Sequence, residues 1–398
     1  MKTNVRIRSL SVCLLMSLSL VHGQEKRDSV AAEQPEKSSS LVFMGQLTGW
    51  TVLQFPEPVN IQSGARFVPT LTGTHDLSGQ MMLDFEASLH IQGAIDFKGV
   101  RYDTAAAYCK PYRIWMRYHG DRWELRGGLQ KINFGTAKIF RPLMWFDRMD
   151  VRDPIQLTDG VYGLLGKYFF PNSANIWLWT LIGNDKPKGF EFLGSARWVP
   201  EAGGRIQFPL GPGELAFSTH FRRVDMGSLS AVTPAQSYLA EKRFGMDGKW
   251  DIGIGIWFEA STTVMRRNNG VLPQYQDLLN IGADYTIPLG NGIGVTAEYF
   301  RYHGGEQFYC QGYSTDITGM MLDYPLSITD HASAMVFYVS EQQLWFNYLS
   351  YKRSYDQLNL YLIGFWNPAI NLPIGSLPTS QRNLFAEKGL QLMIDYHF

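Results

Sequence analysis

After its first 23 residues, the sequence has no apolar run long enough to cross a membrane as a helix. A spanning helix needs about 20 consecutive apolar residues. The run from Leu10 to Val21 is shorter, follows three basic residues and ends beside Gly23, where a signal peptidase would cleave. We therefore predict a secretory signal peptide over residues 1–23, cleaved near Gly23, and we exclude a helical membrane protein.

The sequence also lacks a net charge. It has 36 basic and 36 acidic residues, and loss of the three basic residues of the signal peptide leaves 33 bases against 36 acids. A nucleic-acid-binding domain needs a basic face, so we expect no nucleic-acid partner.

Cysteine is scarce. The chain has three, and Cys13 lies in the predicted signal peptide. Cys109 and Cys310 remain, both in segments that we expect to be loops. In an oxidising compartment they either pair or stay as two free thiols, and their spacing does not decide between these states.

Motifs of the common enzyme classes are absent as well. The chain contains no HExxH, no CxxC pair, no GxSxG elbow and no GxxxxGK[ST] loop. We therefore predict no metal site, no cofactor and no catalytic residue. The strongest candidate for catalysis is His303, beside Gly304-Gly305-Glu306 at a predicted loop edge.

Aromatic residues and glycine, in contrast, are abundant: 20 Tyr, 24 Phe, 11 Trp and 39 Gly. Apolar and polar residues alternate with period two, the pattern of a strand with one apolar and one polar face. Such strands are typical of barrels whose outer face meets lipid, so the mean hydropathy hides the membrane signal. Trp50 and other tryptophans near strand ends are expected to anchor the membrane interface. The alternation is clearest in residues 81–92, 123–130, 214–222, 252–266 and 389–398.

Two segments resemble a known class of protein. The last strand ends at Phe398, with Tyr396 two residues earlier, and in this it resembles the closing strand of Gram-negative outer-membrane barrels. Residues Arg126–Gly135 read R-x-G-x-Q-x-I-x-F-G and are followed by Asp153-Pro154. This pattern is similar to that of porin-like barrels, including alginate-export-type channels, which often have Trp or Tyr where this chain has Phe134. The resemblance implies a channel and leaves its solute open.

We predict an all-β fold: a closed antiparallel transmembrane β-barrel of about 18 strands, over residues 41–398, after a polar tail at residues 24–40. Sixteen strands is the alternative, because residues 320–328 and 344–352 alternate poorly. Short turns are expected on the periplasmic rim and long loops on the extracellular rim. Either strand number leaves room for an aqueous channel. Long connections are predicted near residues 55–64, 94–111, 135–160, 184–202, 224–240, 266–276, 304–318 and 367–386.

The longest connection, residues 135–160, concentrates charged and aromatic residues. Loops of this length are usually functional or disordered, and Trp145 and Phe146 need a place to be buried. We predict that the loop folds into the lumen and narrows it, with a solvated surface loop as a nearly equal alternative. The predicted constriction residues are Arg141, Asp147, Arg148, Asp150, Arg152 and Asp153.

The polar faces of the predicted strands would line the lumen. Acids and bases are interspersed there, which suits polar solutes and fits neither a strictly cationic nor a strictly anionic filter. We expect a porin-like channel of the outer membrane for passive diffusion of small polar solutes, in contact with membrane lipid, with homo-oligomer formation left open. The alternatives are an outer-membrane lipid hydrolase of the phospholipase or deacylase type, and a non-conducting assembly or adhesion barrel. The predicted wall residues are Glu86, His90, Glu124, Arg126, His220, Arg222, Glu259 and Glu298.

Overall fold

The computed structural model describes residues 39–78, 80–227, 238–265, 272–369 and 384–398. The predicted signal peptide and nearly all of the predicted tail lie outside the described residues. The first strand begins at Ser39, just before the predicted barrel boundary at residue 41.

The described chain forms strands joined by turns and longer connections. The strands are β1 (Ser39–Gln54), β2 (Asn60–Ser78), β3 (Met81–Lys98), β4 (Arg101–His119), β5 (Trp123–Gln130), β6 (Val161–Phe169), β7 (Asn175–Leu181), β8 (Glu201–Leu210), β9 (Gly213–Asp225), β10 (Tyr238–Asp251), β11 (Gly255–Met265), β12 (Tyr275–Ile287), β13 (Ile293–Gln307), β14 (Cys310–Pro325), β15 (Asp330–Val339), β16 (Leu344–Ser354), β17 (Leu358–Trp366) and β18 (Lys388–His397).

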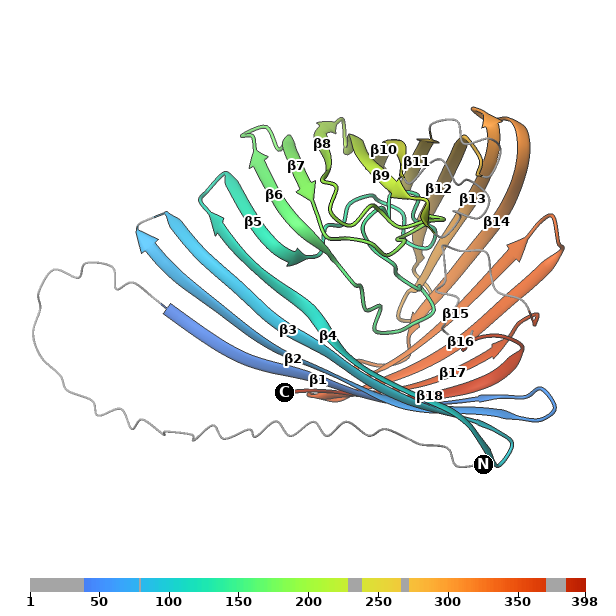
Figure 1. The fold of residues 1–398 in the computed structure, drawn as a ribbon. Helices are drawn as coiled ribbons and strands as arrows, with labels where there is room; N and C mark the ends of the chain where they lie inside the picture. The colour runs from blue at the N-terminus through green and yellow to red at the C-terminus, as the bar shows by residue number, and fades with distance from the viewer. Residues whose placement is uncertain (1–38, 79, 228–237, 266–271, 370–383) are drawn as a thin grey trace, which may run out of the picture. The chain divides into compact units, whose positions relative to one another are not determined.

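The strands form one closed antiparallel sheet of 18 strands, in which each strand pairs with its neighbours in the chain (Figure 1). The circle closes between β18 and β1, where Thr48 lies opposite Asp395. Closure gives the last strand a partner on both edges, β17 and β1, so its backbone groups are paired. The prediction of about 18 strands is confirmed and the alternative of 16 is wrong, because the poorly alternating segments belong to β14 and β16.

Between β4 and β13, short and long connections alternate as predicted. The connection predicted near residues 55–64 spans only residues 55–59, and two of the other predicted long connections are wrong. β3 ends at Lys98 and β4 begins at Arg101, with Gly99 in the left-handed region (φ 59°) between them. β13 and β14 are likewise separated only by residues 308–309. Both strand pairs continue through alanine and glycine, such as residues 105–107 and 304–305, whose small side chains blur the alternation.

Cys109 and Cys310 therefore lie in strands, and their assignment to loops is wrong. Cys109 in β4 is opposite Ile91, and Cys310 in β14 is opposite Gln307. Both thiols are free and exposed, so the structure contains no bond between them.

The outer face of the barrel is apolar and the inner face carries the buried polar groups. In β18, Leu390, Leu392 and Ile394 are exposed by 38 to 51%, whereas Gln391 and Asp395 are buried. An apolar surface of this kind suits lipid as the surrounding medium.

A glycine in the Arg126–Gly135 stretch lets β4 and β5 approach each other. Gly128 has a φ of 118°, and a Cβ there would lie 2.2 Å from the backbone oxygen of Ile114. No other residue type fits this position without moving a strand.

Candidate functional site

The connection between β5 and β6, residues 131–160, runs inside the barrel (Figure 1). It forms hydrogen bonds with Arg66 of β2, Arg113 of β4, Glu259 of β11, Glu298 of β13 and Tyr348 of β16. Because these strands lie on different sides of the wall, the connection crosses the space that the barrel encloses. We call residues 131–160 the inward segment.

Glu298 holds the inward segment through its backbone. Its carboxylate accepts hydrogen bonds of 2.7 to 3.2 Å from the N–H groups of residues 138–140. Trp257 Nε1 and Asn280 Nδ2 donate to the same carboxylate at 3.1 and 2.8 Å. Glu298 is only 2% exposed, and these donors supply the partners that a buried carboxylate requires.

Glu259 holds the segment in the same way. Its carboxylate accepts from the backbone N–H groups of Ala137 at 2.6 Å and Leu143 at 3.1 Å. Gly135 lies against it with a φ of 98°, and a Cβ at this position would be 2.3 Å from Glu259 Oε1. The glycine that ends the Arg126–Gly135 stretch therefore makes room for the carboxylate.

Phe140 fixes the segment to the wall on one side. It has no exposed surface, and its ring lies 5.4 Å from that of Phe300 and 5.8 Å from that of Phe337. A Cβ on Gly319 would approach Phe140 to 2.8 Å, so this wall position must be glycine for the ring to fit.

A second group of aromatic rings fixes the segment on another side. Phe134 and Phe146 pack against Trp179 of β7, and Trp145 packs against both phenylalanines, with ring centroids 5.4 to 6.4 Å apart. Trp145 Nε1 also donates to Ser261 Oγ at 3.0 Å. The need to bury Trp145 and Phe146, which motivated the lumen prediction, is met here.

Residues 182–200, between β7 and β8, also reach the interior, which the sequence did not predict. The Phe190 ring stacks on Phe300 at 5.3 Å. The Glu191 carboxylate forms ion pairs with Arg222 at 3.0 Å and with Arg243 at 2.6 Å. These contacts fill the side of the barrel near β9, β10 and β13.

The space left beside the inward segment is a cavity of about 290 Å³. Met144 and residues 148–159 of the segment face it from one side, and β1 to β4 with β18 form the opposite wall. Phe385, from the connection between β17 and β18, also lines it. The wall contributes Trp50, Arg66, His90, Gln92, Tyr108, Lys110, Gln391 and Met393.

Charged groups of both signs line the cavity, and the acids are paired. Arg66 Nη1 lies 3.4 Å from Asp153 Oδ2, and Arg152 Nη2 lies 2.7 Å from Asp150 Oδ2. Lys110 pairs with Asp159. With Arg148, the lining contains four cationic side chains and three carboxylates.

Two acids of the inward segment have shifted pKa values. Burial raises the pKa of Asp147 to about 6, although the Arg148 backbone N–H donates to its carboxylate at 2.8 Å and opposes this. For Asp159, burial also acts to raise the pKa, but the hydrogen bond and charge of Lys110 outweigh it, and the pKa is lowered.

The predicted constriction residues divide into two groups. Arg148, Asp150, Arg152 and Asp153 line the cavity. Arg141 and Asp147 do not: both are buried, and Arg141 donates to Asn133 Oδ1 and to the Phe134 carbonyl oxygen. A constricting role for the first group stays a proposal.

The predicted wall residues face inward, but of the eight only His90 lines the cavity. Glu259 and Glu298 contact the inward segment, as described above. The other five belong to polar networks on the wall: Glu86 accepts from Trp115 Nε1, Glu124 pairs with Lys167, Arg126 stacks on Trp115, His220 contacts Glu201, and Arg222 pairs with Glu241.

Several cavity residues were missed from the sequence. Arg66 lies in β2, for which no inner face was predicted. Lys110 lies in β4, in a segment that was expected to be a loop, and Trp50 was expected at the membrane interface. Trp50 is 9% exposed and faces inward, 5.9 Å from the Arg66 guanidinium. Thr48, Trp50 and Val52 are all buried on the inner face, but two of the three are apolar, so the polar and apolar pattern of the sequence did not indicate it.

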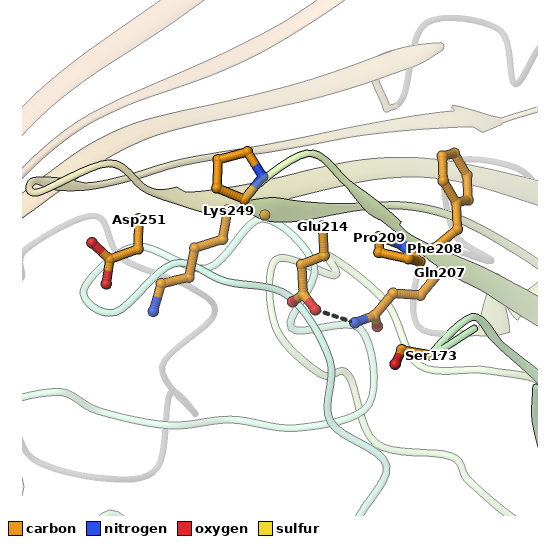
Figure 2. Close-up of a pocket in the computed structure, with 9 residues that line it drawn as sticks. Ser173, Gln207, Phe208, Pro209, Glu214, Lys249 and Asp251 are labelled. Carbon is orange, nitrogen blue, oxygen red and sulfur yellow. Dashed lines mark hydrogen bonds between the residues drawn. The ribbon is translucent and has the colours of Figure 1, made fainter. Parts of the chain in front are cut away.

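A second hollow, of about 400 Å³, lies on the rim that carries the short turns (Figure 2). Figure 2 shows Glu214 and Gln207 joined by a hydrogen bond, 2.6 Å long, with Lys249 and Asp251 beside them. The inward segment does not reach this hollow, which is lined by residues of β8, β9 and β10, by Pro212, and by Ser173 of the turn between β6 and β7. We therefore take the interior cavity as the candidate site.

Across the described parts of the chain, no cluster of three or more His, Cys, Asp or Glu side chains could hold a metal ion. In the same parts, no helix has the length and apolarity to span a membrane.

The chain matches no protein-family model and no curated protein. Its fold is similar to that of Pseudomonas aeruginosa OccK5 (OpdH), with a TM-score of 0.57 and 12% identity over 90% of this chain and 98% of that chain. Acinetobacter baumannii OccAB4 has a TM-score of 0.55 and 9% identity over 92% of this chain and 100% of that chain. The Vibrio cholerae outer membrane protein OmpT, in its trimer form, has a TM-score of 0.52 and 11% identity over 91% and 100%. At these identities the likeness concerns the fold alone, and it confirms the predicted porin-like barrel fold.

Proposed function

We propose that this protein is an outer-membrane channel for the passive diffusion of small polar solutes, and that the cavity beside the inward segment is its narrowest part. One observation carries the proposal: an 18-stranded closed barrel contains a segment that crosses its interior and leaves a cavity lined by charged groups. Barrels of this strand number enclose an aqueous channel unless the lumen is filled. Diffusion down a gradient needs no cofactor.

The lining favours a mixed filter with a weak preference for anions. Arg66, Lys110, Arg148 and Arg152 face three carboxylates, so one positive charge is in excess when His90 is neutral. Rings of charged side chains set the charge selectivity of pores. We expect a permeability ratio that favours anions by a small factor.

Planar-bilayer recordings test this function directly. The purified protein should give steady single-channel conductance, and proteoliposomes should admit uncharged solutes up to a sharp size limit. A tight seal at every voltage would refute the channel and leave the non-conducting assembly or adhesion barrel in its place.

Location and assembly follow from the same proposal. We infer that the chain is inserted in the outer membrane, in contact with its lipid, after signal-peptide cleavage near Gly23. One structural neighbour is described in a trimer form, so a homo-oligomer is part of the proposal. Cell fractionation, N-terminal sequencing and native mass spectrometry in detergent measure location, cleavage and subunit number.

One observation favours a second candidate, a hydrolytic site on the outer face. Asp277, His303 and Ser314 are register partners on β12, β13 and β14. His303 Nδ1 lies 3.3 Å from Asp277 Oδ2, and Tyr309 covers the pair with its ring and its backbone N–H. A histidine oriented by an acid beside a serine is the arrangement that serine hydrolases use. Because β13 extends to Gln307, His303 lies within a strand, and its assignment to a loop edge is wrong.

Ester hydrolysis by the purified protein tests this candidate. Activity that is lost in Ser314→Ala, together with covalent labelling of Ser314 by a fluorophosphonate, would support it. A protein that neither cleaves phospholipid or short-chain esters nor takes up the label would eliminate it.

A further inference from the structure

We propose that Glu259 and Glu298 are positioning residues of the channel, which fix the inward segment in place and do not contact the solute. The inference rests on the proposed channel function. The two glutamates are 0 and 2% exposed and neither lines the cavity, so a passing solute does not reach them.

The inward segment has two parts with different partners. Residues 137–143 are bound through backbone N–H groups by Glu259 and Glu298. Residues 148–159 face the cavity and form side-chain ion pairs with its wall. The first part, which we call the anchored part, thus determines where the second part lies, and through it the width of the passage.

The anchoring depends on carboxylates because each interaction needs an acceptor. The N–H groups of three consecutive residues, 138–140, converge on Glu298, and such a run of amides forms a concave anion site. Trp257 and Asn280 add side-chain donors to the same two oxygens. Glutamine has the same size, but its amide nitrogen would face N–H donors and leave part of them without an acceptor. Glu298→Gln therefore removes the anchor without creating a cavity.

The aromatic contacts provide the competing explanation. Phe140 is packed between Phe300 and Phe337, and Trp145 and Phe146 pack on the opposite group of rings. If these rings alone held the segment, the glutamates could be neutralised without effect. The two explanations differ only in what happens when the charge is removed and the rings are kept.

Asp395 is the matched control for this comparison. It lies in β18, is 2% exposed, and accepts hydrogen bonds from Gln46 Nε2 at 3.0 Å and from Thr48 Oγ1 at 2.7 Å. Asp395→Asn thus neutralises an equally buried inward-facing carboxylate whose partners belong to β1 and β18 and not to the inward segment.

Amide hydrogen exchange, read by mass spectrometry on the detergent-solubilised barrel, measures the anchored part. Heat-modifiable gel migration first shows which variants fold. We expect exchange at residues 137–143 to increase about tenfold in Glu298→Gln and in Glu259→Gln, the factor that one lost hydrogen bond to a charged group is worth. Exchange there should stay at the native rate in Asp395→Asn. The Glu259 variant tests the proposal alone if the Glu298 variant does not fold.

Single-channel recording supplies the second readout. Both anchor variants should show frequent steps between conductance levels where the native channel is steady. Native exchange rates at residues 137–143 in both variants would overturn the anchoring proposal even if the channel conducts. A native protein that does not conduct would instead overturn the channel function, while the exchange result still decides whether the glutamates anchor the segment.

Discussion

Arg148 projects from the inward segment and lines the cavity, together with Arg66, Lys110 and Arg152. The substitution Arg148→Glu changes this lining from four cations and three acids to three cations and four acids. We expect the channel to change from a weak anion preference to a cation preference, because a guanidinium is always charged and a glutamate at the pore surface is ionised at neutral pH.

The size of the effect follows from Coulomb's law. A unit charge about 5 Å from a passing ion contributes about 0.8 kcal/mol in water, which screening at 0.1 M salt reduces to about 0.5 kcal/mol. Reversing the charge changes the energy of each ion by about twice that value, with opposite signs for cation and anion. The cation-to-anion permeability ratio should therefore increase by roughly thirtyfold at most, and by about tenfold if ions pass farther from the side chain.

Reversal potentials in a KCl gradient across a planar bilayer give this ratio. Arg197→Glu is the matched control, since its side chain is 59% exposed and pairs loosely with Asp185 at 3.8 Å, away from the cavity. The shift should shrink at 1 M salt, where screening is stronger. Equal reversal potentials for the native protein and Arg148→Glu, in a variant that still conducts, would mean that ions do not pass through this cavity.

Three further predictions concern the segment and the barrel. Because burial raises the pKa of Asp147 to about 6, its stabilising contribution is complete below about pH 4 and is lost as the pH rises through 6; the amide protection factors of the inward segment, corrected for the intrinsic exchange rate at each pH, should fall over this range by at most about 3 kcal/mol, and Asp147→Asn should abolish this fall. Gly319→Val should displace the Phe140 ring, which a Cβ would approach to 2.8 Å, and raise exchange in the anchored part by at least about tenfold, while gel migration still shows a folded barrel. Gly128→Ala should lower the free energy of unfolding by about 2 kcal/mol or more, and the barrel should therefore unfold at a lower temperature on heated gels. Gly364→Ala is the control, because no atom lies within 4 Å of a Cβ there, and it should unfold at the native temperature. Equal unfolding temperatures for the two variants would contradict the close approach of β4 and β5.

The barrel could be predicted from the sequence because each strand carries its own evidence. Period-two alternation assigns an inner and an outer face without any knowledge of the neighbouring strands, as in residues 389–398. The pattern weakens where small residues occupy the strand, and residues 94–111 and 304–318 were therefore expected to be loops. In such segments the local alternation does not identify the strand, because the strand forms by pairing with the other arm of its hairpin.

The cavity could not be predicted to the same extent. Arg66 and Lys110 are far apart in the sequence, and only the register of β2, β3 and β4 brings them to one side of the lumen, where Asp159 of the inward segment pairs with Lys110. The connection at residues 182–200 gave no signal as strong as the length and aromatic content of residues 135–160. Its inward course brings Glu191 to Arg222 of β9 and Arg243 of β10, and no local sequence pattern encodes this contact between a loop and two strands.

Inward-facing charged residues have two different roles in this barrel: some hold the inward segment in place, and others line the passage. Glu259 and Glu298 face the interior, but the anchored part of the inward segment covers them. Their carboxylates accept hydrogen bonds from backbone N–H groups and therefore contribute little to the electric field in the passage. The field that a solute meets comes instead from Arg66, Lys110 and the charged residues of the inward segment. Substitutions at the cavity lining should therefore change selectivity with little effect on steadiness, and substitutions at the anchors should change steadiness first. Recordings that showed the reverse assignment would require the solute to pass on the β11–β13 side of the inward segment.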